Sequence, residues 1–181
     1  MSILKKKFLK EAGNKMKEEF GYKNFLAIPK IEKISVNVGL SRATSSPNFT
    51  EEVLKDLAKI TGQKPVKNKA KKAIAGFKIR AGQEVGASVT LRGERMWDFL
   101  DKLVWVSIPR IRDFQGISQR NIDEQGNLSL GFKEQTVFPE ILVDEVAVNF
   151  GLQVNIKTTA KNKKEGLRLF QLLGFPFKQD F

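Results

Sequence analysis

Three stretches of the chain alternate apolar and polar side chains, which is the pattern of a strand with one buried face. They cover residues 31–39, 85–91 and 152–159. In the first stretch the apolar face carries Ile34 and Val36, and the opposite face carries Asn37. A fourth, shorter strand is expected over 64–69. The sequence therefore predicts four strands that offer apolar faces to helices.

Apolar residues recur at helical spacing in four other stretches. The predicted helices cover 3–20, 49–60, 93–106 and 163–173. Trp97 and Trp105 lie eight residues apart on the third helix, a spacing that favours core packing over base stacking. The first helix is basic and amphipathic, so it packs its apolar stripe on the domain or, as a weaker alternative, lies on a membrane surface.

The order of these elements predicts an α+β fold rather than a doubly wound parallel sheet. Each alternating strand offers its apolar face to helices and has a polar face on the opposite side. No linker or repeat divides the sequence, so a single domain over residues 1–181 is expected. Two parts depart from regular structure: a long basic loop at about 70–83, and an irregular excursion at about 107–139 with a hairpin turn near 123–127.

The charge balance points to a polyanionic partner. The chain has 181 residues, with 32 Lys and Arg against 20 Asp and Glu, a formal net charge of +12. Residues 64–82 carry seven of these cations and no acidic residue. Such a segment suits nucleic acid first and an anionic membrane second, while a solvated basic loop remains the plainer alternative.

The residue types present exclude most catalytic chemistry. The chain has no cysteine and no histidine, so Cys/His zinc sites and His-dependent nucleophilic catalysis are excluded. No phosphate-binding glycine loop is present. The paired carboxylates at 98/101, 123/124 and 144/145 are expected on solvated surface. We therefore expect no enzyme activity, no cofactor and no metal, in a cytosolic protein with neither a membrane span nor a secretory signal.

The polar faces of the alternating strands are the sharper indication of function. They carry Ser, Thr, Asn and Gln more than Lys and Glu, and such side chains can hydrogen-bond sugars, phosphates and 2′-hydroxyls. An ordinary wet sheet face is the alternative. Two aromatic residues, Phe77 and Phe114, are flanked by cations in glycine-containing loops and are expected to contact a partner.

Six separate blocks of sequence resemble the L5 family of large-subunit ribosomal proteins, which bind 5S rRNA. The blocks are ITGQKPV (60–66), KAKK-AGFKIR (69–80), VTLRGERMWDF (89–99), IPRIRDF-G (108–116), G-N-S-G-EQ-FPEI (126–141) and TTAK-EG-LL--FPF (158–177). They occur in the order expected for the family, from the first strand to the C-terminus. The resemblance implies an α+β fold with a mainly antiparallel sheet, helices packed on one face and a polar RNA-facing surface. It also implies a cytoplasmic protein of the ribosome that helps attach 5S rRNA in the central protuberance.

The same resemblance implies three groups of contact residues. The 5S rRNA-binding group is Asn37, Gln63, Thr90 and Arg92. The loop expected to contact the P-site tRNA carries Lys71, Lys72, Phe77, Lys78 and Arg80. The side facing a small-subunit head protein across an inter-subunit bridge carries Arg110, Arg112, Asp113 and Phe114, within segments 109–116 and 138–144. Further partners implied are large-subunit rRNA and neighbouring ribosomal proteins.

Three positions depart from the family pattern. Asn68 stands where Thr is usual and Ala73 where Ser is usual, which puts side-chain hydrogen bonds near the tRNA loop in doubt. Gln115 replaces a usual Arg, which weakens an expected ionic contact at the bridge or to rRNA. Two rival interpretations are an enzyme that acts on RNA and a basic protein that binds a membrane surface. An enzyme should show an acidic cluster or a cofactor-binding loop. A membrane-surface protein should keep its affinity for anionic vesicles when RNA competes.

Overall fold

The computed structural model describes residues 2–40, 48–77, 79–142, 146 and 148–178. The chain forms two compact units, each assembled from separate segments of the sequence. Unit 1 holds Met1–Ile34, Leu91–Leu130 and Asn155–Phe181, and unit 2 holds Ser35–Thr90 and Gly131–Val154. The single domain expected from the sequence stays a prediction.

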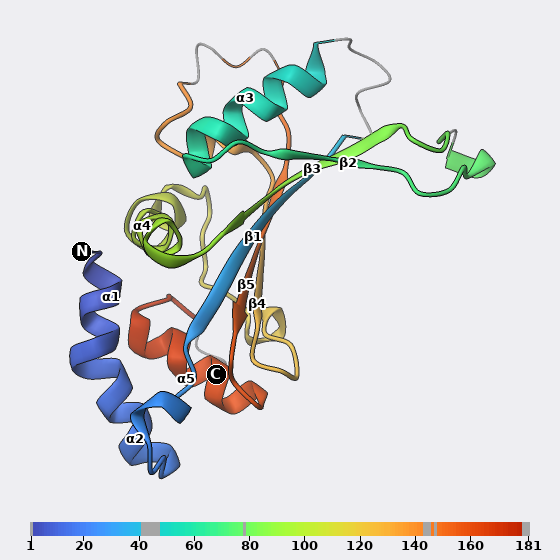
Figure 1. Ribbon diagram of the computed structural model, residues 1–181. Coiled ribbons are helices and arrows are strands. Elements are labelled where there is room, and N and C mark those ends of the chain that lie inside the picture. Colours follow the sequence, from blue (N-terminus) through green and yellow to red (C-terminus); the bar gives the residue numbers. More distant parts are fainter. Residues whose placement is uncertain (1, 41–47, 78, 143–145, 147, 179–181) are drawn as a thin grey trace. The chain divides into compact units, whose positions relative to one another are not determined.

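Five strands form one antiparallel sheet in the order β2-β3-β1-β5-β4 (Figure 1). The strands are β1 (Ile31–Gly39), β2 (Val66–Lys69), β3 (Glu84–Leu91), β4 (Leu128–Phe132) and β5 (Leu152–Thr158). The three alternating stretches correspond to β1, β3 and β5, and their apolar side chains are buried, as Val36, Leu91 and Ile156 illustrate. The predicted α+β fold class is therefore confirmed.

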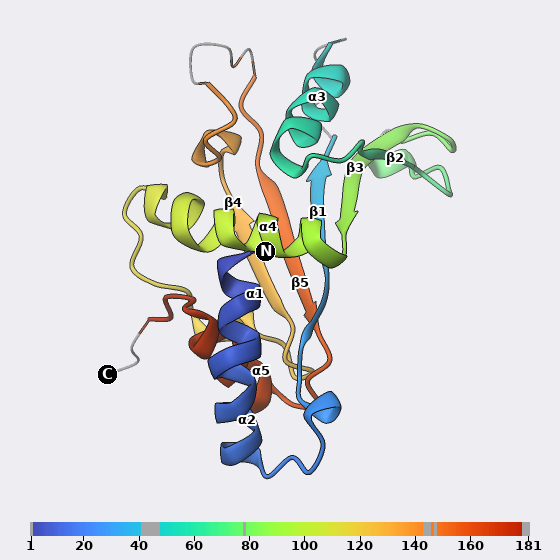
Figure 2. The same ribbon diagram turned by 60° about the vertical axis from the view of Figure 1, so that its left-hand side comes forward.

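The helices of unit 1 lie where the apolar periodicity placed them. They are α1 (Ile3–Lys7), α2 (Gly13–Phe20), α4 (Gly93–Lys102) and α5 (Lys163–Leu173). A π-helical turn, Phe8–Ala12, joins α1 to α2, and a second one, Leu103–Ser107, extends α4. Within this unit α1 contacts α4 and α2 contacts α5 (Figure 2).

The start of α1 is held by a carboxylate from α4. The oxygens Oδ2 and Oδ1 of Asp101 accept hydrogen bonds from the backbone N–H groups of Ile3 (2.8 Å) and Leu4 (2.9 Å). A second link is the ion pair between Lys5 and Glu94. The first N–H groups of a helix have no partner inside the helix, and a negative charge there also favours the helix dipole. Asp101, expected on solvated surface, is thus a half-buried helix cap supplied from outside the helix.

Replacing this cap should measurably destabilise the protein. We expect Asp101→Ala to lower the free energy of unfolding by about 1 kcal/mol, the usual loss for a capping side chain. Chemical denaturation followed by circular dichroism measures the change. Asp98→Ala is the matched control because Asp98 is exposed on the same helix, and it should change stability by less than about 0.5 kcal/mol. Equal effects of the two substitutions would contradict the capping role.

Unit 2 contains α3 (Phe49–Thr61) and the hairpin formed by β2 and β3. The helix buries Val53, Leu57 and Ile60 and ends at Gly62, whose φ of 64° gives the left-handed conformation common after a helix C-terminus. The hairpin continues past the last strand residues into a narrow arm that ends in a short 3-10 turn, Ala75–Phe77 (Figure 1). This arm is the segment predicted as a basic loop.

The excursion at 107–139 is mostly irregular, as expected. It contains 3-10 turns at Ile108–Arg110, Gln119–Asn121 and Gln135–Val137, and it also contains β4. The predicted turn near 123–127 is confirmed: the carboxylate of Asp123 accepts hydrogen bonds from the backbone N–H groups of Gln125 (3.0 Å) and Asn127 (2.7 Å). Asp123 is therefore a turn residue rather than one member of an acid pair.

Candidate nucleic-acid interface

The polar face expected to bind 5S rRNA lies on unit 2, across β1, β2 and β3. Thr90 is exposed on β3, and Asn37 is half-buried on the neighbouring β1. Gln63 follows the end of α3, and its Nε2 donates a hydrogen bond to the backbone oxygen of Thr90 (3.2 Å). This hydrogen bond holds Gln63 beside Thr90 and does not use the hydroxyl group of Thr90. The structure thus brings two of the predicted residues together and places the third on the adjacent strand.

Asn68 belongs to this polar face rather than to the arm. It lies opposite Gly86 in the register of β2 and β3. Its Nδ2 donates to Oγ of Ser88 (3.1 Å), and the Ser88 hydroxyl lies 3.3 Å from Asn68 Oδ1. The departure from the family pattern at position 68 therefore affects the neutral hydrogen-bonding surface of the sheet. Ala73 is exposed on the arm, where it was expected.

Arg92 lies in unit 1, just before α4, whereas the other three predicted 5S-binding residues lie in unit 2. Its side chain is exposed. A hydrogen bond from Lys157, whose Nζ lies 2.9 Å from Glu32 Oε2, is the main cause that holds the pKa of Glu32 below its usual value, and the charge of Arg92 makes a smaller contribution.

The arm is a hairpin held by its own backbone. Ala70 and Gln83 are joined by a hydrogen bond from N to O (2.8 Å), and Ile74 and Ile79 exchange a pair of them (2.9 and 3.1 Å). These bonds make the segment more regular than the predicted loop. Because a backbone so paired leaves side chains pointing outward, the arm can present its charges without a supporting core.

The predicted tRNA-contacting side chains of the arm are accessible. Lys71, Lys72 and Arg80 are exposed, and Phe77 at the tip is 75% exposed. Lys78 lies outside the described residues. Exposing the apolar ring of Phe77 to water costs free energy. Surrounded by cations, this ring offers a stacking surface to a nucleotide. Nearer the sheet, Lys67 is paired with Glu84 (3.0 Å).

The residues predicted at the inter-subunit bridge follow the π-helical turn of unit 1. Arg110 and Arg112 are exposed, Asp113 is exposed with a φ of 53°, and Phe114 is half-buried. A left-handed conformation is uncommon for aspartate and marks a tight reversal of the chain. The departing residue Gln115 is exposed.

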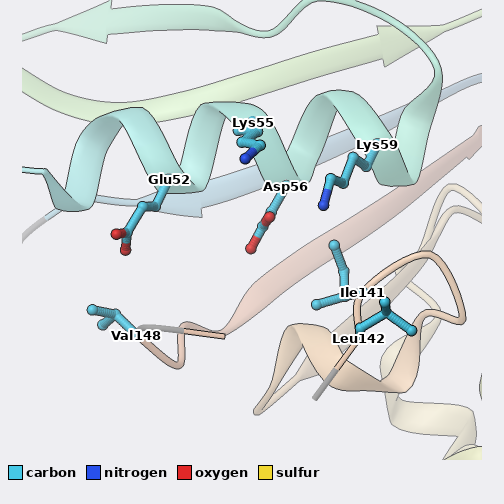
Figure 3. Close-up of a pocket in the computed structure, with 7 residues that line it drawn as sticks. All are labelled: Glu52, Lys55, Asp56, Lys59, Ile141, Leu142 and Val148. Carbon is cyan, nitrogen blue, oxygen red and sulfur yellow. The ribbon is translucent and has the colours of Figure 1, made fainter. Parts of the chain in front are cut away.

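The second segment predicted at the bridge, 138–144, is buried at its start and exposed further along the chain. Phe138 is fully buried and packs edge-to-face on Phe132, with ring centroids 5.6 Å apart. Leu142 is 58% exposed, and residues 143–144 lie outside the described residues. Ile141, Leu142 and Val148 line a cavity of about 400 Å³ with Glu52, Lys55, Asp56 and Lys59 of α3 (Figure 3). Its charges are mixed in sign, which does not suit a polyanion.

Trp105 corrects an expectation from the sequence. Trp97 is buried and packs against Phe8, with ring centroids 5.9 Å apart, but Trp105 is 53% exposed. Side chains eight positions apart on a helix of 3.6 residues per turn are offset by about 80° around its axis, so the two tryptophans need not share a face. Here only Trp97 faces the core. Trp105 is therefore a surface residue.

No catalytic arrangement is evident in the described parts of the chain. Those residues contain no group of three or more His, Cys, Asp or Glu side chains that could hold a metal ion. The carboxylate of Glu19 accepts a hydrogen bond from Arg168 (2.6 Å), and this bond lowers the pKa of Glu19. Glu165 is buried and accepts from the backbone N–H of Lys161 (3.0 Å) at the start of α5. These acids are occupied with structural contacts.

Tyr22 gives a titration that tests the packing of unit 1. Its hydroxyl oxygen is buried, and burial together with the nearby Glu165 carboxylate raises its pKa to about 12. Because its pKa is raised, the neutral phenol of Tyr22 is favoured in the native state and stabilises the fold relative to the unfolded chain. This contribution to stability is fully present below about pH 10 and is lost as the pH rises toward 12.

The chain has a single tyrosine, so tyrosinate absorbance reports this group directly. We expect a midpoint near 12 for the folded protein and near 10 in denaturant. Circular dichroism in parallel shows whether the chain is still folded. A folded protein with an ordinary midpoint would contradict the buried environment of Tyr22.

None of the described helices is long and apolar enough to cross a membrane. The described residues together form a basic α+β protein.

Comparison with known proteins identifies its family. The family model "Ribosomal protein L5" matches residues 24–80, and the model for the C-terminus of the same ribosomal family matches residues 84–177. The large ribosomal subunit protein uL5 of Dictyoglomus turgidum is 51% identical over 99% of this chain and 100% of that protein. The uL5 of Moorella thermoacetica is 47% identical over 99% of both. This chain belongs to the ribosomal protein L5 family, whose members are structural, non-enzymatic proteins of the ribosome in the cytoplasm.

Proposed function

We propose that this chain, as a constituent of the large ribosomal subunit, binds 5S rRNA through the polar face of β1, β2 and β3. Membership of the L5 family supports the ribosomal role. The observation that carries the 5S assignment is the neutral, accessible hydrogen-bonding face on which Gln63 is held beside Thr90. A folded RNA presents 2′-hydroxyls, phosphates and base edges to such a surface. In this role the protein helps to attach 5S rRNA in the central protuberance.

The arm has a separate role in this proposal. Its exposed cations and Phe77 suit a second RNA, the P-site tRNA, with the lysines and arginine on phosphates and the ring on a nucleotide. The segments 109–116 and 138–144 face a small-subunit head protein across an inter-subunit bridge. The exposed Arg110, Arg112 and Leu142 support this part because each offers a side chain to a partner.

Binding to isolated 5S rRNA should be tight and should weaken with salt. Each phosphate neutralised by a lysine or arginine releases condensed counterions, so log K should fall linearly with log salt concentration. A filter-binding or gel-shift series at several salt concentrations measures the slope. Anionic vesicles serve as the competitor that distinguishes the membrane alternative. Failure to bind 5S rRNA, or displacement by vesicles rather than by unlabelled 5S rRNA, would contradict the proposal.

A further inference from the structure

An exposed apolar patch lies at the end of the α4 helical run in unit 1. Trp105 is 53% exposed and Val106 is 39% exposed, both on the π-helical turn, and Pro109 is exposed on the 3-10 turn that follows. The other members of the π-helical turn are buried, Leu103 completely. The fold thus anchors the turn from one side and leaves its tryptophan accessible from the other.

Two cations follow this patch closely in the sequence. Arg110 and Arg112 are exposed, and within the described part of the chain neither forms an ion pair or hydrogen bond through its guanidinium. By contrast, Arg168 in the same unit is paired with Glu19. Two exposed guanidinium groups within seven residues of an exposed indole are complementary to an apolar pocket bordered by carboxylates. Tryptophan and arginine are also the residues most enriched at the energetic centres of protein interfaces.

We propose that Trp105 and Val106 anchor a protein–protein contact, in which Trp105 enters an apolar pocket that Asp or Glu side chains border on the partner. The proposal rests on the bridge role given above for Arg110 and Arg112, and it therefore assigns the partner to the small-subunit head. Trp105 and Val106 extend that contact surface along the chain, toward α4.

A protein partner fits this patch better than RNA does. The RNA-type surface of the arm places an aromatic ring among several exposed cations and no acid. Here a branched aliphatic residue, Val106, follows the tryptophan directly in the sequence, and the exposed Asp113 follows within eight residues. Lys102, at the end of α4, lies over the ring of Phe99, 5.4 Å from its centroid. The patch therefore has an apolar centre with a mixed polar rim, as protein interfaces do.

Site-specific photo-crosslinking in assembled ribosomes tests the proposal. Large subunits carrying Trp105→p-benzoylphenylalanine are irradiated alone and after joining with small subunits, and the crosslinked peptide is identified by mass spectrometry. Arg112→p-benzoylphenylalanine is the matched probe for the bridge itself. In parallel, Trp105→Ala should weaken subunit joining by about ten-fold, as loss of an interface anchor does, and Trp105→Phe should weaken it less.

We expect the Trp105 probe to crosslink a small-subunit protein, only in joined ribosomes, at a segment that contains Asp or Glu. A crosslink to rRNA or to a large-subunit protein would overturn the inference, as would unchanged joining of the Trp105→Ala variant. If the Arg112 probe reaches a small-subunit protein and the Trp105 probe does not, the bridge stands and this inference fails. If neither probe reaches one, the bridge role itself is wrong.

Discussion

Removing the Thr90 hydroxyl and the Asn37 amide should weaken 5S rRNA binding without changing its dependence on salt. Thr90→Val keeps the shape of the side chain and the backbone oxygen that accepts from Gln63. Each hydrogen bond removed costs about 1 kcal/mol, or about five-fold in affinity, and the double variant Thr90→Val with Asn37→Ala should lose at least about 20-fold. The slope of log K against log salt should stay constant because no cation is removed.

Binding of labelled 5S rRNA at several salt concentrations measures both quantities. Ser129→Ala is a suitable control, since Ser129 is an exposed residue on β4, at the sheet edge opposite β2. That variant should bind as the unmodified chain does. A double variant that keeps full affinity would show that the polar face does not recognise 5S rRNA.

Neutralising the cations of the arm should leave 5S rRNA binding intact and weaken tRNA binding. A variant with Lys71, Lys72, Lys78 and Arg80 all replaced by Gln removes four charges from a segment without acidic residues. We expect 5S affinity to change by less than about two-fold, whereas P-site tRNA binding to variant ribosomes should fall about ten-fold or more. The salt slope of the tRNA interaction should decrease by about 0.7 to 0.9 for each phosphate that the variant no longer neutralises.

The matched control removes four exposed lysines from the N-terminal helical run: Lys6, Lys10, Lys15 and Lys17. It changes net charge by the same amount and therefore separates a local contact from general attraction between a basic protein and RNA. If the arm variant lost 5S affinity before tRNA binding, the proposed division of roles between arm and sheet would be wrong.

The sequence predicted the regular elements well because their burial is periodic and local. The strand over 31–39 and the helix over 163–173 have the observed bounds of β1 and α5. The polar face around Thr90 also follows directly from strand alternation, since residues two apart share a face. The contact between Gln63 and Thr90 could not be predicted from periodicity, because it joins residues 27 apart.

The departures from expectation arise where distant residues or unusual helical turns decide the outcome. Asp101 caps α1 across 97 residues of sequence, a partnership that no local pattern encodes. Trp105 was expected in the core together with Trp97, but it is 53% exposed on the π-helical turn that follows α4. The arm was expected as a loop because its sequence is dominated by charge, although its backbone pairs as a hairpin.

The division of roles between the sheet and the arm is tested most directly by a footprint on isolated 5S rRNA. Two proteins are compared: the full chain, and a variant in which residues 71–82 are replaced by Asn-Gly, a two-residue turn suited to close the hairpin between Ala70 and Gln83. If the polar face of β1, β2 and β3 binds 5S rRNA, both proteins should protect the same nucleotides with similar affinity. Loss of protection in the shortened variant would show that the arm, and not the sheet, makes the primary contact.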